Sequence, residues 1–65
     1  MKSDLLASSG TMAGIINILK EYYFSRSIEL KSVSVNEWQV LNSKGVIPSV
    51  RVIRHNNRYR FERMA

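Results

Sequence analysis

The sequence predicts an α+β fold in which two helices pack on a small antiparallel sheet, in the order helix, strand, helix, hairpin. Three observations predict it: residues alternate between apolar and polar around a central Asn56-Asn57, an apolar stripe recurs at helical spacing from Met12 to Tyr23, and helix start and stop signals flank residues 35–44. A chain of 65 residues buries only about 60% of its unfolded surface. We therefore expect residues 1–65 to form one small basic domain of marginal stability.

Residues 1–10 lack a periodic pattern and are rich in small polar residues. Such a composition is typical of a frayed terminus. We therefore predict that residues 1–10 are disordered, and we assign them no function. The alternative is that Leu5 and Leu6 dock on a neighbouring surface.

The first predicted helix runs from Met12 to Tyr23, with Thr11 as its N-cap. Apolar residues recur along one side at positions 12, 15, 16, 19 and 23. The polar side carries a single lysine, Lys20, beside Glu21, whereas a membrane-surface helix carries many basic residues there. We therefore expect an amphipathic helix that faces the protein core.

A short strand is predicted next, over Ser27–Lys31, because apolar and polar residues alternate there and Ile28 and Leu30 would point inward. The second helix is predicted over Val35–Lys44. Ser34 and Glu37 have the spacing of a capping box, and Gly45 suits the cap after the last turn. The predicted core comprises Ile15, Ile16, Leu19, Tyr23, Ile28, Leu30, Val33, Trp38, Leu41, Val50, Val52 and Phe61.

The most specific prediction is a β-hairpin over Val50–Glu62. A two-residue turn at Asn56-Asn57 would place His55 opposite Arg58 and Arg51 opposite Glu62. This register sorts apolar from basic side chains, and a slip of one residue would destroy the sorting. The apolar face carries Val50, Val52, Tyr59 and Phe61, with Arg54 near the tip. The other face carries Arg51, His55, Arg58 and Arg60, with Ile53 and Glu62 among them.

The positive charge is concentrated in this hairpin. Residues 1–45 carry five basic and four acidic residues, a net of +1, whereas residues 46–65 carry five arginines and one glutamate, a net of +4. Together they give the net charge of +5. Arginine presents a planar donor fork that matches phosphates and carboxylates, so the composition favours contact with an anionic partner.

The sequence offers no convergent groups for catalysis. The chain has no cysteine and one histidine, so the common metal sites and a standard triad cannot be built within it. Its five carboxylates lie on separate predicted elements, and its glycines match no nucleotide-binding fingerprint. The longest apolar run, residues 12–19, is too short to span a bilayer. We therefore expect a cytoplasmic binding protein that is not an enzyme and needs no metal or cofactor.

The basic hairpin face predicts a small accessory nucleic-acid-binding protein, with DNA as the favoured ligand. The predicted contact residues are Arg51, Arg54, His55, Arg58 and Arg60. Two alternatives stay open: a regulator, inhibitor or subunit that docks its hairpin or strand edge on an acidic protein, and a basic surface that is merely solvated. A sheet edge could also pair two copies into a homodimer.

Three short stretches resemble phage excisionases, which belong to the winged-helix DNA binders: Glu37-Trp38, Ile47-Pro48 and residues 58–61. The resemblance implies a hairpin wing beside a recognition helix. Between Trp38 and Ile47 there is room to complete one helix but not for a separate recognition helix, so no family is assigned and no residue roles are transferred.

Overall fold

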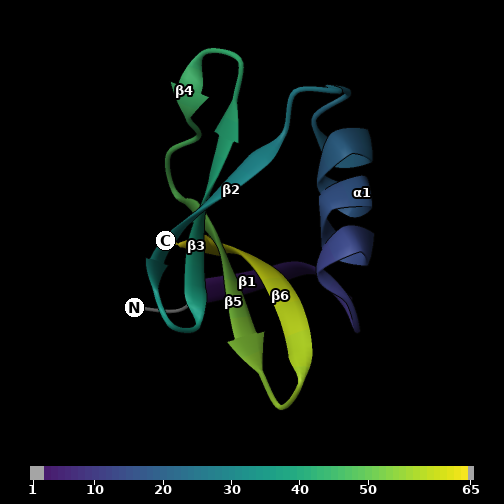
Figure 1. The fold of residues 1–65 in the computed structure, drawn as a ribbon, viewed down its shortest axis with the longest axis vertical. Coiled ribbons are helices and arrows are strands. Elements are labelled where there is room, and N and C mark those ends of the chain that lie inside the picture. Colours follow the sequence, from purple (N-terminus) through teal and green to yellow (C-terminus); the bar gives the residue numbers. More distant parts are fainter. Residues whose placement is uncertain (1–2, 65) are drawn as a thin grey trace.

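Six strands and one helix make up the fold in a computed structural model, which describes residues 3–64 (Figure 1). The elements are β1 (Ser3–Ser9), α1 (Met12–Tyr22), β2 (Glu29–Ser34), β3 (Glu37–Asn42), β4 (Gly45–Val46), β5 (Val50–His55) and β6 (Arg58–Met64). The antiparallel sheet has the order β1-β6-β5-β3-β2, and β4 pairs with β3. The prediction of two helices on a small sheet is therefore wrong, because α1 is the one helix among the described residues and the sheet is the larger part.

The predicted first helix is confirmed as α1. Thr11 caps it, since its hydroxyl accepts a hydrogen bond from the backbone N–H of Gly14 at 3.0 Å. Ile15 and Leu19, one turn apart, are fully buried. The helix packs against β1 and β6. Its apolar stripe thus predicted both the helix and the side that faces the core.

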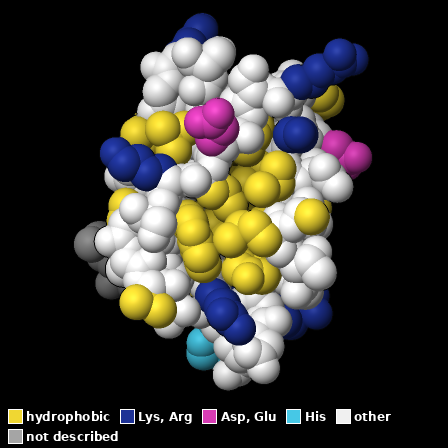
Figure 2. Space-filling model, in the orientation of Figure 1, with side chains coloured by type: hydrophobic (Ala, Val, Ile, Leu, Met, Phe, Trp, Pro, Cys, Tyr) yellow, Lys and Arg dark blue, Asp and Glu magenta, His cyan; other side chains and the backbone are white. Residues whose placement is uncertain are grey.

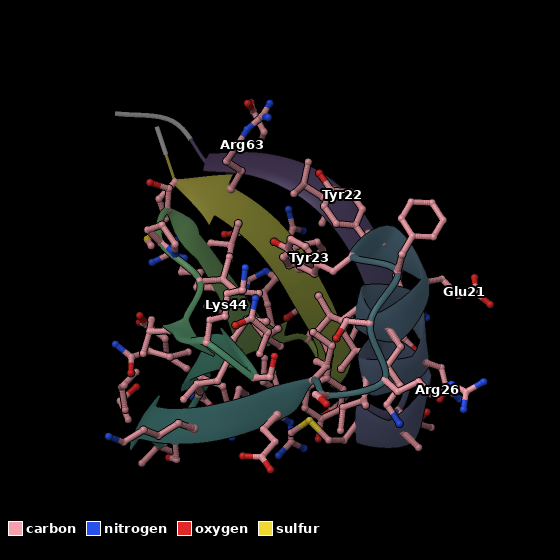
Figure 3. All side chains as sticks on the ribbon, turned by 90° about the horizontal axis from the view of Figure 1, so that it is seen from above. Glu21, Tyr22, Tyr23, Arg26, Lys44 and Arg63 are labelled. Atoms are coloured by element: carbon pink, nitrogen blue, oxygen red, sulfur yellow. The ribbon has the colours of Figure 1, made fainter. Side chains whose placement is uncertain are left out.

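Two tyrosines lie where α1 ends, above β6 (Figure 3). The rings of Tyr22 and Tyr23 meet Phe61 edge-on at centroid distances of 5.2 and 6.0 Å. Burial raises the pKa of the Tyr23 phenol above its ordinary value, and the adjacent Tyr22 adds to the effect. Phe24 then turns the chain away with a φ of 50°, and its side chain is 96% exposed.

The predicted helix over Val35–Lys44 is wrong, because this segment forms β3 and the turns on either side of it. Glu37 to Val40 alternate between polar and apolar in the strand period, and Val40, which the helical spacing overlooked, is fully buried. Ser34 and Glu37 face each other as the last pair of the β2–β3 hairpin instead of capping a helix. The winged-helix resemblance loses its support here, because the segment directly before the hairpin forms the strands β3 and β4 and not a helix.

The residues that were predicted to end this helix also form part of a hairpin. The Asn42 side chain accepts a hydrogen bond from the Lys44 backbone N–H at 2.8 Å, which forms an Asx turn. Gly45 follows with a φ of +118°. Asparagine at the first position and glycine at the fourth are typical of a type I turn, and Leu41 and Val46 then pair across the strands. The same glycine that suits a helix cap therefore closes a turn.

The prediction of disorder over residues 1–10 is wrong for the described part of that range. Ser3–Ser9 form β1, which pairs with β6 through a register that shifts between Leu5 and Ala7. Leu6 and Ala7 pack on the core, whereas Leu5 is half-exposed. Met1 and Lys2 lie outside the described residues. Pairing with a strand more than fifty positions away supplies the order that the local sequence does not predict.

The hairpin over Val50–Glu62 is confirmed in every predicted pair. β5 and β6 join with His55 opposite Arg58 and Arg51 opposite Glu62. The turn residues Asn56 and Asn57 have φ values of 51° and 61°, as a type I′ turn requires.

The predicted strand over Ser27–Lys31 also exists, but it lies further along the chain as β2. The buried apolar core consists of Ile15, Leu19, Ile28, Val40, Val50, Val52 and Phe61. Val33, which was predicted to be in the core, is 48% exposed, and Leu41 is only half-buried because it points away from α1.

In residues 3–64, no helix has the length and apolarity to cross a membrane.

Substituting Gly45 with alanine tests the β3–β4 turn. An added Cβ would meet no atom within 4 Å, so the only penalty is the positive φ, which L-residues rarely adopt. We expect the free energy of unfolding to fall by about 1–2 kcal/mol, measured by urea denaturation. Gly10→Ala is the control, because its Cβ would lie in ordinary contact, 3.8 Å from Arg58 Nη1, and we expect a change of about 0.5 kcal/mol or less. Equal losses for both variants would contradict this account.

Candidate nucleic-acid interface

The five predicted contact residues separate into two groups along the hairpin. Arg54, His55 and Arg58 flank the turn and are exposed, whereas Arg51 and Arg60 lie further down the strands and are half-buried. We refer to the first three residues as the tip cluster. The structure therefore brings all five onto one hairpin but does not give them the same surroundings.

Arg51 and Arg60 are held by one buried carboxylate. Glu62 is 5% exposed, and its Oε2 accepts a hydrogen bond from Arg60 Nε at 2.9 Å. Its Oε1 accepts a hydrogen bond from Arg51 Nη2 at 3.3 Å, and Arg51 Nη1 also lies 4.0 Å from an Oε1 of Glu37. Two arginines are thus balanced by two glutamates. This ionic cluster offers little net charge to an anionic ligand.

The tip cluster has no such acidic neighbour. Within residues 3–64, none of its three side chains forms an ion pair with an aspartate or glutamate. Arg54 Nη2 donates to the side-chain oxygen of Asn57 at 3.4 Å, and His55 Nε2 lies 3.2 Å from Asn56 Nδ2. Both contacts are exposed and involve neutral partners. The positive charge of the tip is therefore available to a ligand.

A type I′ turn holds the tip cluster in a defined place. Arg54 extends from the apolar face of the hairpin, since it pairs with Tyr59, while His55 and Arg58 extend from the opposite face. A backbone hydrogen bond also ties this end to the turn between β2 and β3, because the Arg54 N–H donates to the carbonyl of Asn36 at 2.9 Å. The cluster thus surrounds the end of the hairpin and contributes to both faces.

Two aromatic rings lie beside Arg54 on the face that packs on α1. Trp38 pairs with Val52 across the sheet, and its ring lies 5.8 Å from that of Tyr59 at an angle of 59°. Both side chains are half-buried. Figure 2 shows apolar side chains gathered at the centre of the view, with both basic (Lys, Arg) and acidic (Asp, Glu) side chains around them. The position of Trp38 beside Tyr59 was not predicted, because Trp38 was assigned to a helix. The alternation of polar and apolar residues around Trp38 indicates a strand and would have predicted this position.

A pocket of about 370 Å³ lies on the opposite side of the sheet. It is lined mainly by apolar residues, and its charged residues are Glu37 and Arg51, which face each other. No group of three or more histidine, cysteine or acidic side chains that could hold a metal ion occurs between Ser3 and Met64. The charged residues in this pocket already neutralise each other, so the tip cluster is the stronger candidate site.

No family model, curated protein or solved structure matches the chain, so its function has to be inferred from the geometry of its own residues.

Proposed function

We propose that this chain is a small accessory nucleic-acid-binding protein of the cytoplasm that binds DNA through the tip of its β5–β6 hairpin. The observation that carries the proposal is the tip cluster: three exposed basic side chains beside a type I′ turn, with no acidic ion-pair partner among residues 3–64. Basic side chains of this kind neutralise phosphates and release counterions, which supplies affinity without sequence reading.

The ionic cluster reduces the number of phosphate contacts that we expect. Glu62 already engages Arg51 and Arg60, so moving either arginine to a phosphate would deprive a buried carboxylate of one of its two partners. The ligand is therefore contacted by Arg54 and Arg58, with the exposed His55 beside them adding a third contact. The protein binds as a non-catalytic accessory factor that uses two or three phosphates.

Salt dependence measures this number directly. We expect the affinity for a labelled DNA duplex, followed by fluorescence anisotropy, to fall with a log–log slope of about −2 to −3 between about 25 and 200 mM NaCl. Five independent contacts would instead give a slope near −4.5. The double variant Arg54→Gln/Arg58→Gln should lose about two units of slope.

Lys44→Gln is the control, because Lys44 is exposed in the β3–β4 turn and lies away from the tip. It should bind DNA like the parent protein. Absence of binding at the lowest salt concentration, or equal losses for Lys44→Gln and the double variant, would overturn the proposed function.

A second candidate is an acidic protein as the partner of the same tip. The apolar side chains at the centre of the view in Figure 2, surrounded by charged ones, favour it, because protein interfaces combine an apolar centre with a polar rim. Pull-down from nuclease-treated lysate separates the two candidates. A stoichiometric acidic protein that is retained by the parent and lost with Arg54→Gln/Arg58→Gln would favour the protein partner.

A further inference from the structure

The two edges of the sheet differ in how well they are protected. β1 forms one edge, and its register shift between Leu5 and Ala7 interrupts the strand, a common device against edge pairing. β2 forms the other edge, and in Figure 3 it lies at the margin of the sheet with no strand outside it. Five of its six residues are exposed, and it contains no proline. β2 is therefore the open edge.

The regular part of β2 is complementary to itself. Glu29, Leu30 and Lys31 pair regularly with β3, and the register shifts only beyond Ser32. If a second copy of this strand runs antiparallel with its Leu30 opposite the first, each Glu29 faces a Lys31. Within residues 3–64, neither charge has an ion-pair partner. Opposite charges directly across two antiparallel strands favour this register over a slipped one.

We propose that two copies of this chain form a homodimer by antiparallel pairing of their β2 strands, with the two-fold axis at Leu30. The sheets of both copies then join into one continuous sheet. The inference is independent of the proposed function, because β3 separates β2 from β5 and the tip cluster stays exposed.

The apolar side of the sheet supports the same arrangement. Leu30 pairs with the buried Val40, so it points to the side of the sheet that faces α1, whereas Glu29 and Lys31 point to the other side. The helix packs closest to β1 and β6, at the far end of the strand order from β2. Pairing at β2 would place the two Leu30 side chains in contact and bring together the apolar surfaces that Figure 2 shows.

Pairing of one short strand forms a small interface, so the dimer should depend on concentration. We expect the average mass to rise from about that of the monomer, 7.5 kDa, toward twice this value between about 10 µM and 1 mM in sedimentation equilibrium. Lys31→Glu places acidic residues opposite each other at both contacts, and Glu29→Lys places basic residues there. Either variant alone should weaken dimerisation roughly tenfold or more.

Mixing the two variants gives the decisive measurement. A Glu29→Lys chain paired with a Lys31→Glu chain restores opposite charges at both contacts, so the mixture should dimerise like the parent although each variant alone dimerises more weakly. Lys44→Glu and Glu21→Lys are matched controls that change the net charge equally at exposed sites outside β2, and both should dimerise like the parent. Circular dichroism verifies that each variant is folded.

A parent chain that stays monomeric at every concentration would overturn the proposal. So would a dimer that tolerates both single substitutions, because another surface would then join the copies, or a mixture of the two variants that stays monomeric. Failure of DNA binding would leave this result unchanged, since neither Glu29 nor Lys31 belongs to the tip cluster.

Discussion

Replacing Phe61 with alanine is expected to lower the free energy of unfolding by about 3–5 kcal/mol. Phe61 is fully buried and pairs with Val52 across the hairpin, and its ring contacts the two tyrosines at the end of α1. Removing the ring therefore leaves a cavity between the helix and the middle of the sheet. A loss of this size is comparable to the whole stability of a small domain, so the variant should be largely unfolded at room temperature.

The chain provides its own control for this substitution, because it contains two phenylalanines and the other one, Phe24, is 96% exposed. We expect Phe24→Ala to change the free energy of unfolding by about 0.5 kcal/mol or less. Phe61→Leu, with an expected loss of about 1–2 kcal/mol, keeps the measurement quantitative if the alanine variant does not fold. Denaturation followed by Trp38 fluorescence measures all three. Equal effects at positions 24 and 61 would contradict the assignment of Phe61 to the core.

The local sequence correctly predicted those elements whose sequence signals are compatible with only one type of secondary structure. The hairpin over Val50–Glu62 was predictable because its turn residues and the sorting of its side chains agree on a single register. The first helix was predictable because its apolar stripe leaves no alternative period. In both cases, neighbouring residues carry the information, and no distant strand is needed.

The prediction of a second helix over Val35–Lys44 was wrong because its sequence signals are compatible with both a helix and a hairpin. A serine three positions before a glutamate suits both a capping box and the end of a hairpin, and an asparagine three positions before a glycine suits both a helix end and a type I turn. The spacing of Val35, Trp38 and Leu41 is helical, whereas that of Trp38 and Val40 is a strand spacing. The burial of Val40 in the sheet decides between them, and only tertiary packing supplies that fact.

β1 could not be predicted for a different reason. Its order comes from pairing with β6, at the opposite end of the chain, and its small polar residues carry no strong strand signal of their own.

The five residues of the candidate site were predicted together, but their separation into the ionic cluster and the tip cluster was not predicted. The pairing of Arg51 with Glu62 was predictable from the register, whereas Arg60 joins the same carboxylate because residues two apart on a strand share a face.

Glu62→Ala is expected to lower the free energy of unfolding by about 2–3 kcal/mol. The substitution removes the carboxylate that Arg51 and Arg60 share and leaves their two guanidinium groups with only Glu37, 4.0 Å from Arg51, as a nearby counter-charge. The side chains of these arginines are 29% and 36% exposed, so water lessens the penalty below that of a fully buried pair. Chemical denaturation of the variant and the parent measures the difference.

Asp4→Ala is the matched control, because Asp4 accepts a hydrogen bond from Arg63 at 3.4 Å on the same sheet but both side chains are more than half exposed. We expect its loss to be about 0.5 kcal/mol or less. A second test uses Arg51→Met/Arg60→Met/Glu62→Leu, which replaces the whole ionic cluster with apolar side chains and should recover most of the stability that Glu62→Ala loses. A triple variant no more stable than Glu62→Ala would show that packing of Glu62, and not its charge, accounts for the loss.

The same carboxylate also limits the proposed DNA contact, which gives Glu62 a second measurable effect. In Glu62→Gln, the side chain keeps its size but loses its charge, so Arg51 and Arg60 become available to phosphates on the face of the hairpin that also carries Arg58. We expect DNA binding by the folded variant to tighten and its log–log salt slope to steepen by about two units, from roughly −2 to −3 toward −4 to −5. An unchanged slope would mean that the two arginines stay away from the ligand even when they are released, and that the hairpin tip alone forms the DNA contact.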